Sequence, residues 1–447
     1  MQFITDYRLE NYILNTNWEN FPDSIKERAI LCSIDLFGAL IIGSAGKQYQ
    51  IGKKISESLG LKGCIAVFGN QKFNLLGATI AFSHAANSFD IDDGYNMIKG
   101  HPGASFIGGI LAASIEKNVS YEEFLSTLVL CYECTIRWGL VEQEYYGFLH
   151  STGTYGAFGT AAGIGRLHRL SREKLNNALS MADYHAPMTP VMRAVEYPSM
   201  NKDGVPFGSL IGTMAVIETE LGESAKTHLL ELPQYMGYLD SLGKHYYIED
   251  LYFKPYTCCR WAHQPIKACI DLMRKYTITA EKIKKVVVHT FVAATKLSKA
   301  IPNNTDEAQY NIAYPVAAAI VHGDVGYEQI NDEAIHDQCV IDMMGKLTFL
   351  VDQEMEKQFP ESRLAWVEII LNNDKVYKSN IYEAPGEATD PKLSYTWIVE
   401  KFKQRTSSIL KREYQEKIIQ ILSKNNSWKL RDIMDTINEG FKPLDIK

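Results

Sequence analysis

The spacing of apolar residues changes twice along the chain, and these changes constrain the fold more than any single motif. Up to about residue 267, apolar residues recur every three or four positions, which is typical of amphipathic helices. β-Branched runs at 284–292 and 364–371 then predict strands, before the helical spacing returns at 394–422. We therefore predict a mostly α protein with an α+β insert.

The two changes imply that the helical part of the chain is discontinuous. We predict a large helical-bundle domain made of residues 1–267 and 397–447, and a smaller α+β lid domain made of residues 268–396. The length of 447 residues agrees with two domains, since single hydrophobic cores rarely grow beyond about 250 to 300 residues. Inside the lid, residues 364–378 predict a hairpin and residues 313–321 a helix.

One helix of the first part carries an unusual face. Further helices are expected there at residues 22–39, 75–87, 103–116, 121–138, 153–166, 175–184 and 209–221. In the helix at 153–166, Gly153, Gly156, Gly159 and Gly163 share one face. Each glycine disfavours a helix by up to about 1 kcal/mol relative to alanine. The glycine face therefore indicates close approach of another helix or a ligand, and it marks the centre of the bundle.

The charge and the apolar segments exclude several classes of partner. The net charge is −7 with mixed signs, and no Lys/Arg run could follow phosphates, so we expect no nucleic acid. The first residues include Asp6 and Glu10 and do not resemble a secretory signal. The apolar run at 36–45 is shorter than the roughly twenty residues of a membrane span. We expect a cytoplasmic protein with no membrane contact, whose eight cysteines are reduced thiols.

Several ionisable residues lie within about twenty positions of small and apolar sequence. They are Asp90, Asp92, Asp93, His84 and His101. Apolar surroundings disfavour charge unless a partner or a ligand compensates it. Turns use the same residue types, so any one of them could be structural. Their occurrence together, just before the small-residue run at 104–113, indicates an acid/base site.

Four further segments carry side chains that suit a site. Residues 150–154 place an imidazole and hydroxyls before the glycine-lined helix, whose free N–H groups favour an anion. Lys202 lies in a turn, residues 254–263 gather Lys, Arg, His, Tyr and thiols at the domain junction, and residues 310–315 open an apolar helix. The structural alternatives, an incidental histidine at a helix start, a solvated lysine and a core tyrosine, stay open.

Cofactor motifs are weak throughout the chain. Cys131 and Cys134 lie in the middle of a predicted helix with no matching second pair for zinc or an iron–sulfur cluster. The acidic residues at 90–96 are spaced irregularly for a magnesium–diphosphate site, and no second acidic motif exists. Gly163 and Gly165 lack the third glycine and the preceding strand of a dinucleotide fingerprint. None of these motifs predicts a cofactor.

Taken together and in order, the motifs resemble the MmgE/PrpD family. The matching stretches are His84-Ala85, Phe89–Asp93, His101-Pro102, 150–159, 254–263 and 314–319. The family includes 2-methylcitrate dehydratase, cis-aconitate decarboxylase and iminodisuccinate epimerase. The resemblance spans nearly the whole chain. It implies a helical domain from both chain ends, a lid domain between them, a homodimer, and no metal or organic cofactor.

The resemblance also implies site residues. Those at the active-site positions of the family are Asp90, His101, His150, Lys202, His263 and Tyr314. This chain departs from the family pattern at 203–206, where a basic, histidine-containing segment is expected, and by one extra residue between Asp90 and His101. Arg260 is not shared by all branches of the family. It is a candidate for the residue that makes the substrate of this subgroup differ from those of the other branches.

The reactions of the family all form or quench a carbanion beside carboxylates, which requires fixed cations and a tuned acid or base. The residues expected to hold substrate carboxylates are Lys202, Arg260, Thr152 and His150. His101, oriented by Asp90, is expected to transfer the proton, with His263 or Tyr314 opposite. We predict a lyase for a small di- or tricarboxylate; an iminodisuccinate-type epimerase and a non-catalytic helical binding protein are the alternatives.

Overall fold

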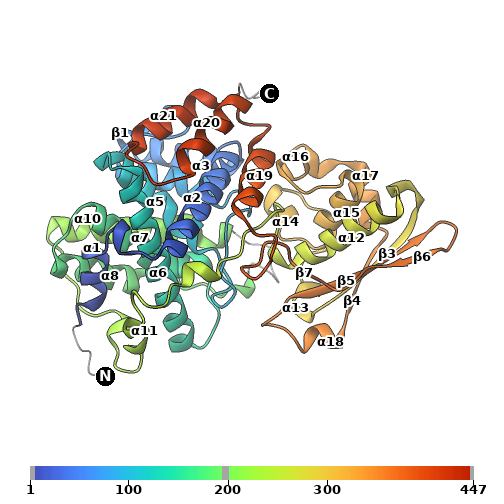
Figure 1. The fold of residues 1–447 in the computed structure, drawn as a ribbon, viewed down its shortest axis with the longest axis horizontal. Coiled ribbons are helices and arrows are strands. Elements are labelled where there is room, and N and C mark those ends of the chain that lie inside the picture. Colours follow the sequence, from blue (N-terminus) through green and yellow to red (C-terminus); the bar gives the residue numbers. More distant parts are fainter. Residues whose placement is uncertain (1–5, 194–200, 443–447) are drawn as a thin grey trace.

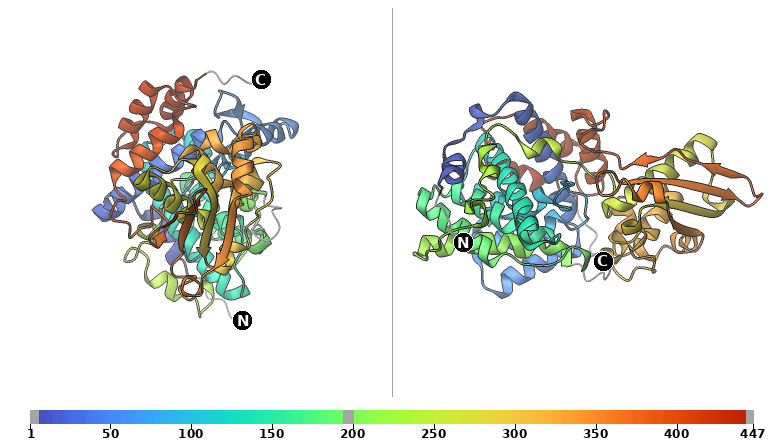
Figure 2. Two further views of the ribbon diagram at one scale, coloured as in Figure 1. Left: turned by 90° about the vertical axis from the view of Figure 1, so that its right-hand side faces the viewer. Right: turned by 90° about the horizontal axis from the view of Figure 1, so that it is seen from below.

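The computed structural model describes residues 6–193 and 201–442. A large helical body and a smaller α+β lid lie side by side along the longest axis (Figures 1 and 2). The body helices from the first part of the chain are α1 (Arg8–Asn15), α2 (Asp23–Gly43), α3 (Lys47–Ser58), α4 (Leu75–Ala86), α5 (Pro102–Lys117), α6 (Tyr121–Tyr146), α7 (Thr152–Leu167), α8 (Arg172–His185), α10 (Val205–Leu221) and α11 (Gly237–Asp240).

The last helices of the chain return to the body, where they lie beside α2 and α5 in Figure 1. They are α19 (Tyr395–Thr406), α20 (Arg412–Leu422) and α21 (Leu430–Gly440). Helix α19 packs against α2, and α21 contacts α5. The prediction of a discontinuous helical domain with an α+β insert is therefore confirmed. The residue boundaries 267/268 and 396/397 stay a prediction.

Helix α7 lies at the centre of the body, where it packs against α5, α6 and α10. A Cβ atom added to Gly153 would lie 2.2 Å from the backbone oxygen of Gly204, and one added to Gly156 would lie 2.5 Å from the Cβ of Ser105. Real Cβ atoms do not approach other atoms so closely, so only glycine permits these helix contacts. The close approach that the glycine face predicts is confirmed.

The lid is built on a mixed sheet with strand order β4-β3-β5-β6, and β7 also pairs with β5. Its strands are β3 (Ile283–Thr290), β4 (Leu347–Val351), β5 (Leu364–Leu371), β6 (Val376–Lys378) and β7 (Tyr382–Glu383). Strand β3 runs parallel to β4 and antiparallel to β5, with Val288 opposite Val367. The predicted strand and the predicted β5–β6 hairpin are confirmed.

Helices cover the lid sheet and connect its strands. They are α12 (His263–Tyr276), α13 (Val292–Thr295), α14 (Thr305–Gln309), α15 (Ala313–His322), α16 (Tyr327–Ile330), α17 (Gln338–Met344) and α18 (Gln353–Glu356). Along β5, burial alternates, with Ala365, Val367 and Ile369 buried. Since successive side chains of a strand point to opposite faces, this alternation gives β5 one apolar face, and α12 packs on β5.

Two features of the body differ from the sequence analysis. The first part of the chain contains a short hairpin of β1 (Lys62–Ala66) and β2 (Lys72–Phe73), which is not among the elements expected for an almost entirely helical first half. The second feature is α6, which the sequence analysis did not consider as a membrane span. Helix α6 is long and apolar enough to cross a membrane, but 94% of its most apolar window is buried inside the protein, so α6 is a core helix.

The loop between α4 and α5 is tied to three other parts of the chain. Gly94 exchanges two backbone hydrogen bonds with Tyr252, at 3.0 and 2.9 Å, in the segment that crosses from body to lid. Lys401 of α19 donates to the carbonyl oxygen of Ile91 at 2.8 Å and pairs with Asp35 of α2. The acidic loop singled out in the sequence is therefore fixed in position by elements from both ends of the chain.

Candidate active site

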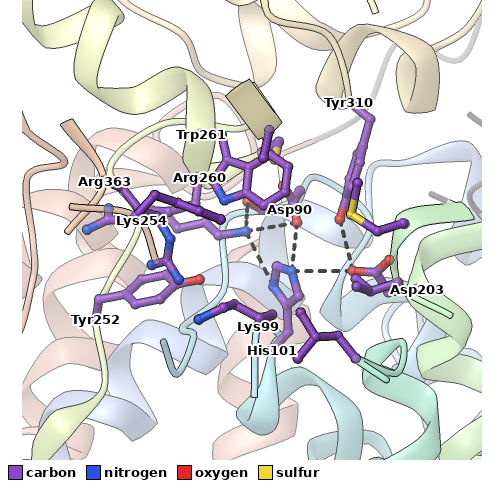
Figure 3. A pocket seen from close by; sticks show the side chains of 16 residues that line it. Asp90, Lys99, His101, Asp203, Tyr252, Lys254, Arg260, Trp261, Tyr310 and Arg363 are labelled. Atoms are coloured by element: carbon purple, nitrogen blue, oxygen red, sulfur yellow. Dashed lines mark hydrogen bonds and ion pairs between the residues drawn. The ribbon is translucent and has the colours of Figure 1, made fainter. Parts of the chain in front are cut away.

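A pocket of about 760 Å³, counted with its mouth, lies where the α4–α5 loop, the crossing segment and the lid meet (Figure 3). Aromatic and apolar side chains line it together with several charged groups. The acidic and basic side chains of the lining are Asp90, Lys99, His101, Asp203, Lys254, Arg260 and Arg363. Clefts with a few convergent polar groups on apolar walls are typical of small-molecule sites.

His101 is held at the centre of the charged groups. It is the residue before α5, and its backbone N–H donates to Thr152 Oγ1 at 3.2 Å. Its Nδ1 lies 2.9 Å from Asp92 Oδ2, and its Nε2 lies 3.4 Å from Asp90 Oδ1 and 3.5 Å from Asp203 Oδ2. Three carboxylates therefore surround one imidazole.

The carboxylates of the loop are positioned by further contacts. Asp90 has a φ of +52°, a left-handed conformation that Asp adopts more readily than most residues. Lys254 Nζ lies 2.9 Å from Asp90 Oδ1 and 3.1 Å from the carbonyl oxygen of Asp90. Asn87 donates to Asp92 Oδ1 at 2.8 Å. Asp93 accepts the N–H of Gly103 at 3.0 Å, at the start of α5, and lies outside the pocket lining.

These contacts shift the protonation of the cluster. Burial and the nearby Lys254 charge act to lower the pKa of His101, but Asp92 and Asp90 outweigh them and raise it above its ordinary 6.5. Burial acts to raise the pKa of Asp92, but the His101 charge and hydrogen bond hold it below its ordinary value. The imidazolium form of His101 therefore persists to a higher pH than in an isolated histidine, and this form can donate a proton into the pocket.

We expect the inflection that His101 gives to the pH profile of kcat/KM to lie above pH 6.5. Replacing Asp92 with asparagine removes the main partner of the imidazolium, so the inflection should move to lower pH. The raised pKa also stabilises the fold below pH 6.5, and this contribution is lost as the pH rises through the folded-state pKa. Asp271→Asn, outside the pocket, is the control. If the inflection does not move in Asp92→Asn, it does not belong to His101.

Cationic side chains gather on one side of His101 in Figure 3. The Arg260 guanidinium lies over the Tyr252 ring, 4.4 Å from its centroid, and donates to Glu387 Oε1 at 2.7 Å. Arg363, from the start of the lid hairpin, donates to the side-chain oxygen of Asn96. Burial and the charge of Arg363 lower the pKa of Lys99 to about 8. This side of the pocket can bind an anion.

The opposite side of His101 carries an acid and a hydroxyl. Tyr310 donates to Asp203 Oδ2 at 2.9 Å, and Figure 3 shows both side chains across from the arginines. Lys202, Asp203 and Gly204 all have left-handed φ values of +52°, +51° and +70°. This turn directs Asp203 into the pocket, whereas Lys202 donates to Gln309 Oε1 at 2.7 Å and pairs with Asp306 at 2.6 Å.

The pocket lining thus includes three of the predicted site residues, Asp90, His101 and Arg260, and not Lys202. His150 is also outside the lining: its ring packs on Phe148, with ring centroids 3.8 Å apart, and it pairs with Glu142. Burial lowers the pKa of His150 to about 4. Thr152 is outside as well.

His263 and Tyr314 complete the set of predicted residues, and neither lines the pocket. His263 Nε2 lies 3.0 Å from the carbonyl oxygen of Cys258, and burial, with the charge of Arg260, lowers the pKa of His263 well below its usual range. The Tyr314 hydroxyl donates to the carbonyl oxygens of Gln329 and Ala334, both at 2.9 Å. Their roles in the reaction stay predictions, and we leave them out of the mechanism proposed below.

Sequence reasoning did not name as site residues six polar residues that line the pocket: Lys99, Asp203, Tyr252, Lys254, Tyr310 and Arg363. Lys254 and Tyr310 lie in segments that the sequence analysis singled out, and Asp203 begins the stretch that departs from the family pattern. Those signals marked the segments, but the side chains of these segments that line the pocket include ones that the sequence analysis did not name. Arg363 lies just before a strand, and no motif marks it.

Two pocket residues and the neighbouring Asp92 have ligand atoms close enough to hold a metal ion. Oxygen or nitrogen atoms of Asp90, Asp92 and His101 lie within 4.8 Å of one another. The Lys254 ammonium also lies among them, 2.9 Å from Asp90 Oδ1 and 3.3 Å from His101 Nδ1. Because this ammonium already compensates the carboxylates, the donor set does not require a metal ion. Metal independence stays a prediction.

Comparison with known proteins covers both parts of the chain. Residues 7–249 match the MmgE/PrpD N-terminal domain, and residues 256–426 match the MmgE/PrpD C-terminal domain. The cis-aconitate decarboxylase-like protein oryM of Aspergillus oryzae is 22% identical over 453 residues, covering 91% of this chain and 92% of that protein. The cis-aconitate decarboxylase of Mus musculus is 20% identical over 437 residues, covering 91% and 87%. The chain belongs to the MmgE/PrpD family.

Proposed function

We propose that the protein is a lyase that acts on a small di- or tricarboxylate by acid/base catalysis, without a metal ion or an organic cofactor. The observation that carries this proposal is the His101 imidazole among carboxylates in a pocket with excess positive charge. Four basic side chains, Lys99, Lys254, Arg260 and Arg363, line the pocket with two carboxylates, Asp90 and Asp203. Asp92 and Glu387, outside the lining, pair with His101 and Arg260, so the positive excess of the cluster is the charge of the His101 imidazolium. The names of two relatives, which refer to cis-aconitate decarboxylase, support a lyase.

In the proposed mechanism, Arg260 and Arg363 bind one substrate carboxylate. In a decarboxylation, carbon dioxide leaves a carbon beside a second carboxylate, the electron pair of the broken bond stays on that carbon, and the His101 imidazolium donates its proton there. In a dehydration, the neutral imidazole takes the proton from that carbon and returns it to the departing hydroxide, which leaves as water.

In both reactions negative charge develops on the second carboxylate while the carbon has neither its leaving group nor its proton. Lys254, fixed by Asp90, would stabilise this charge, because a preorganised cation in a buried site needs no reorganisation at the moment of reaction. Asp92 orients the His101 ring and supports its imidazolium form.

An iminodisuccinate-type epimerase is the second candidate, and one observation favours it. Inversion at carbon needs a second proton-transfer group, and Asp203 with its Tyr310 partner lies beside His101 on the side away from the arginines. We keep this candidate because the leaving group, hydroxide, carbon dioxide or a proton, depends on the substrate.

We also propose a cytoplasmic homodimer. Large apolar side chains of α8 and α10 are exposed at a surface groove, where 85% of Tyr184 and 84% of Leu221 are accessible. A second copy that covered this groove would bury them, and burial of apolar surface favours association.

The proposal is tested by incubating the purified protein with 2-methylcitrate, cis-aconitate, citrate and iminodisuccinate in deuterated buffer and following each by NMR. We expect loss of water or of carbon dioxide from one of them. Deuterium in a substrate without net conversion would indicate the epimerase instead. No change in any substrate would contradict both candidates and favour a binding protein. The same assay with a chelator tests metal independence, since loss of activity would contradict it.

A further inference from the structure

Four buried polar atoms of the pocket have no hydrogen-bond partner among the described residues. They are Arg260 Nε, Arg363 Nε, Asp90 Oδ2 and Asp203 Oδ1. The four residues are buried, with exposed fractions of 4, 5, 0 and 4% in that order. Buried polar groups are almost always paired, so unpaired atoms on residues that line a pocket indicate what a ligand must supply.

The two unpaired donors lie on the cationic side. The terminal nitrogens of Arg260 are bound to Pro385 O, Ala384 O and Glu387 Oε1, and those of Arg363 are bound to Asn96. The Nε–H groups of both side chains make no hydrogen bond to a described residue and are left for a ligand. A carboxylate would satisfy them, because charged acceptors make the strongest hydrogen bonds with guanidinium groups.

The two unpaired acceptors lie around His101. The other oxygen of Asp90 already accepts from Lys254, and the other oxygen of Asp203 already accepts from Tyr310. A ligand carboxylate placed here would bring another acceptor with negative charge against two carboxylates, which is unfavourable. The part of the ligand next to Asp90 and Asp203 must therefore carry a hydrogen on oxygen or nitrogen.

We propose that the natural substrate is a carboxylate that also carries a hydrogen-bond donor, a hydroxyl or a protonated amine, which binds to Asp203 and Asp90. This inference rests on the proposed function and narrows its substrate class. Such a substrate would differ from cis-aconitate, which carries carboxylates and a double bond but no such donor. A hydroxy acid or an amino acid with two or three carboxylates fits both sides of the pocket.

The test compares ligands that differ only in the donor. Citrate and tricarballylate carry the same three carboxylates, and only citrate has a hydroxyl; malate and succinate form the same pair with two carboxylates. Dissociation constants are measured by titration calorimetry on the native protein near neutral pH. We expect citrate and malate to bind about 10- to 100-fold more tightly than their partners, as for a hydrogen bond to a charged group. Aspartate, compared with succinate, tests a protonated amine.

Two variants test which residue causes the preference for a ligand with a hydroxyl. Asp203→Asn presents an amide N–H in place of one acceptor oxygen, and Asn tolerates the left-handed φ of this position. In this variant we expect the citrate-to-tricarballylate ratio to fall to within about threefold of one. Arg363→Gln is the matched control, since it should weaken both ligands alike and leave the ratio unchanged. Circular dichroism and thermal melting establish that each variant folds, and the native comparison needs no variant.

Equal affinities for citrate and tricarballylate, and for malate and succinate, would overturn the inference. So would an unchanged ratio in Asp203→Asn. A protonated Asp203 would donate a hydrogen bond to the ligand instead of accepting one, and the two members of each ligand pair would then bind equally well. Failure of the proposed function looks different: a hydroxyl preference without turnover of any substrate refutes the lyase and keeps the inference. Turnover of cis-aconitate without a hydroxyl preference refutes the inference and keeps the lyase.

Discussion

Replacing His101 with alanine is expected to lower kcat/KM by about 10²- to 10⁴-fold, the usual contribution of a positioned acid or base. Among the described residues, His101 is the only histidine that lines the pocket. His150 and His263 are buried with other partners, so neither ring can take over the proton transfer without a rearrangement. The fold should persist, because the backbone N–H of His101 still donates to Thr152.

The measurement is kcat/KM for the substrate found in the NMR assay, together with the rate of deuterium exchange into that substrate. His322→Ala is the matched control, because His322 lies at the end of α15 in the lid and pairs with Asp337. The control should keep native activity. If His101→Ala keeps more than about a tenth of native kcat/KM while His322→Ala is normal, the proton-transfer role of His101 is wrong.

Replacing Lys254 with methionine is expected to destabilise the protein by about 3 to 5 kcal/mol near neutral pH, as for one partner removed from a buried ion pair. Lys254 is buried, and its ammonium contacts Asp90 and His101. Without it, Asp90 loses its close cation. Burial acts to lower the pKa of Lys254, but Asp90 and Asp92 outweigh it and raise that pKa above the ordinary 10.5. The ammonium is therefore charged throughout the range where unfolding is measured.

The free energy of unfolding is read from urea titrations at several pH values. The difference in the free energy of unfolding between the native protein and Lys254→Met should become smaller as the pH falls, because protonation of the carboxylates removes the uncompensated charge. The double variant Lys254→Met/Asp90→Asn is the control, since it removes the carboxylate together with its cation and should recover much of the loss. An equal loss in the single and the double variant would show that Lys254 acts through packing alone.

Much of the body could be predicted because its helices carry local signals. The side chain of Ser120 accepts the backbone N–H of Glu123 at 3.2 Å, and Ser171 does the same for Lys174 at 3.3 Å, as expected of N-cap residues. The hairpin of β1 and β2 carries no comparable signal. Lys62 to Cys64 are exposed on successive positions, so no apolar alternation marks the strand.

The candidate site could be predicted only where one loop contains the chemistry. Asp90 and His101 lie within a dozen residues of each other, and the structure brings them together. The sequence analysis named Tyr314, which lies in α15 outside the pocket lining and whose role stays a prediction, whereas Tyr310 lines the pocket; α14 ends at Gln309 and α15 begins at Ala313. Tyr310 lies in the break between the two helices. Side-chain direction there depends on tertiary packing, which no local spacing encodes.

The contact of Lys401 with Ile91 has a consequence for the order in which the acidic loop is anchored. A ribosome adds roughly 5 to 20 residues per second, so residue 401 emerges tens of seconds after the acidic loop. Until then, Asp35 lacks its lysine partner and the carbonyl oxygen of Ile91 lacks its donor. A nascent chain whose residue 401 has not yet emerged therefore lacks this anchor, and its acidic loop then depends on the contacts with Tyr252 and Lys254.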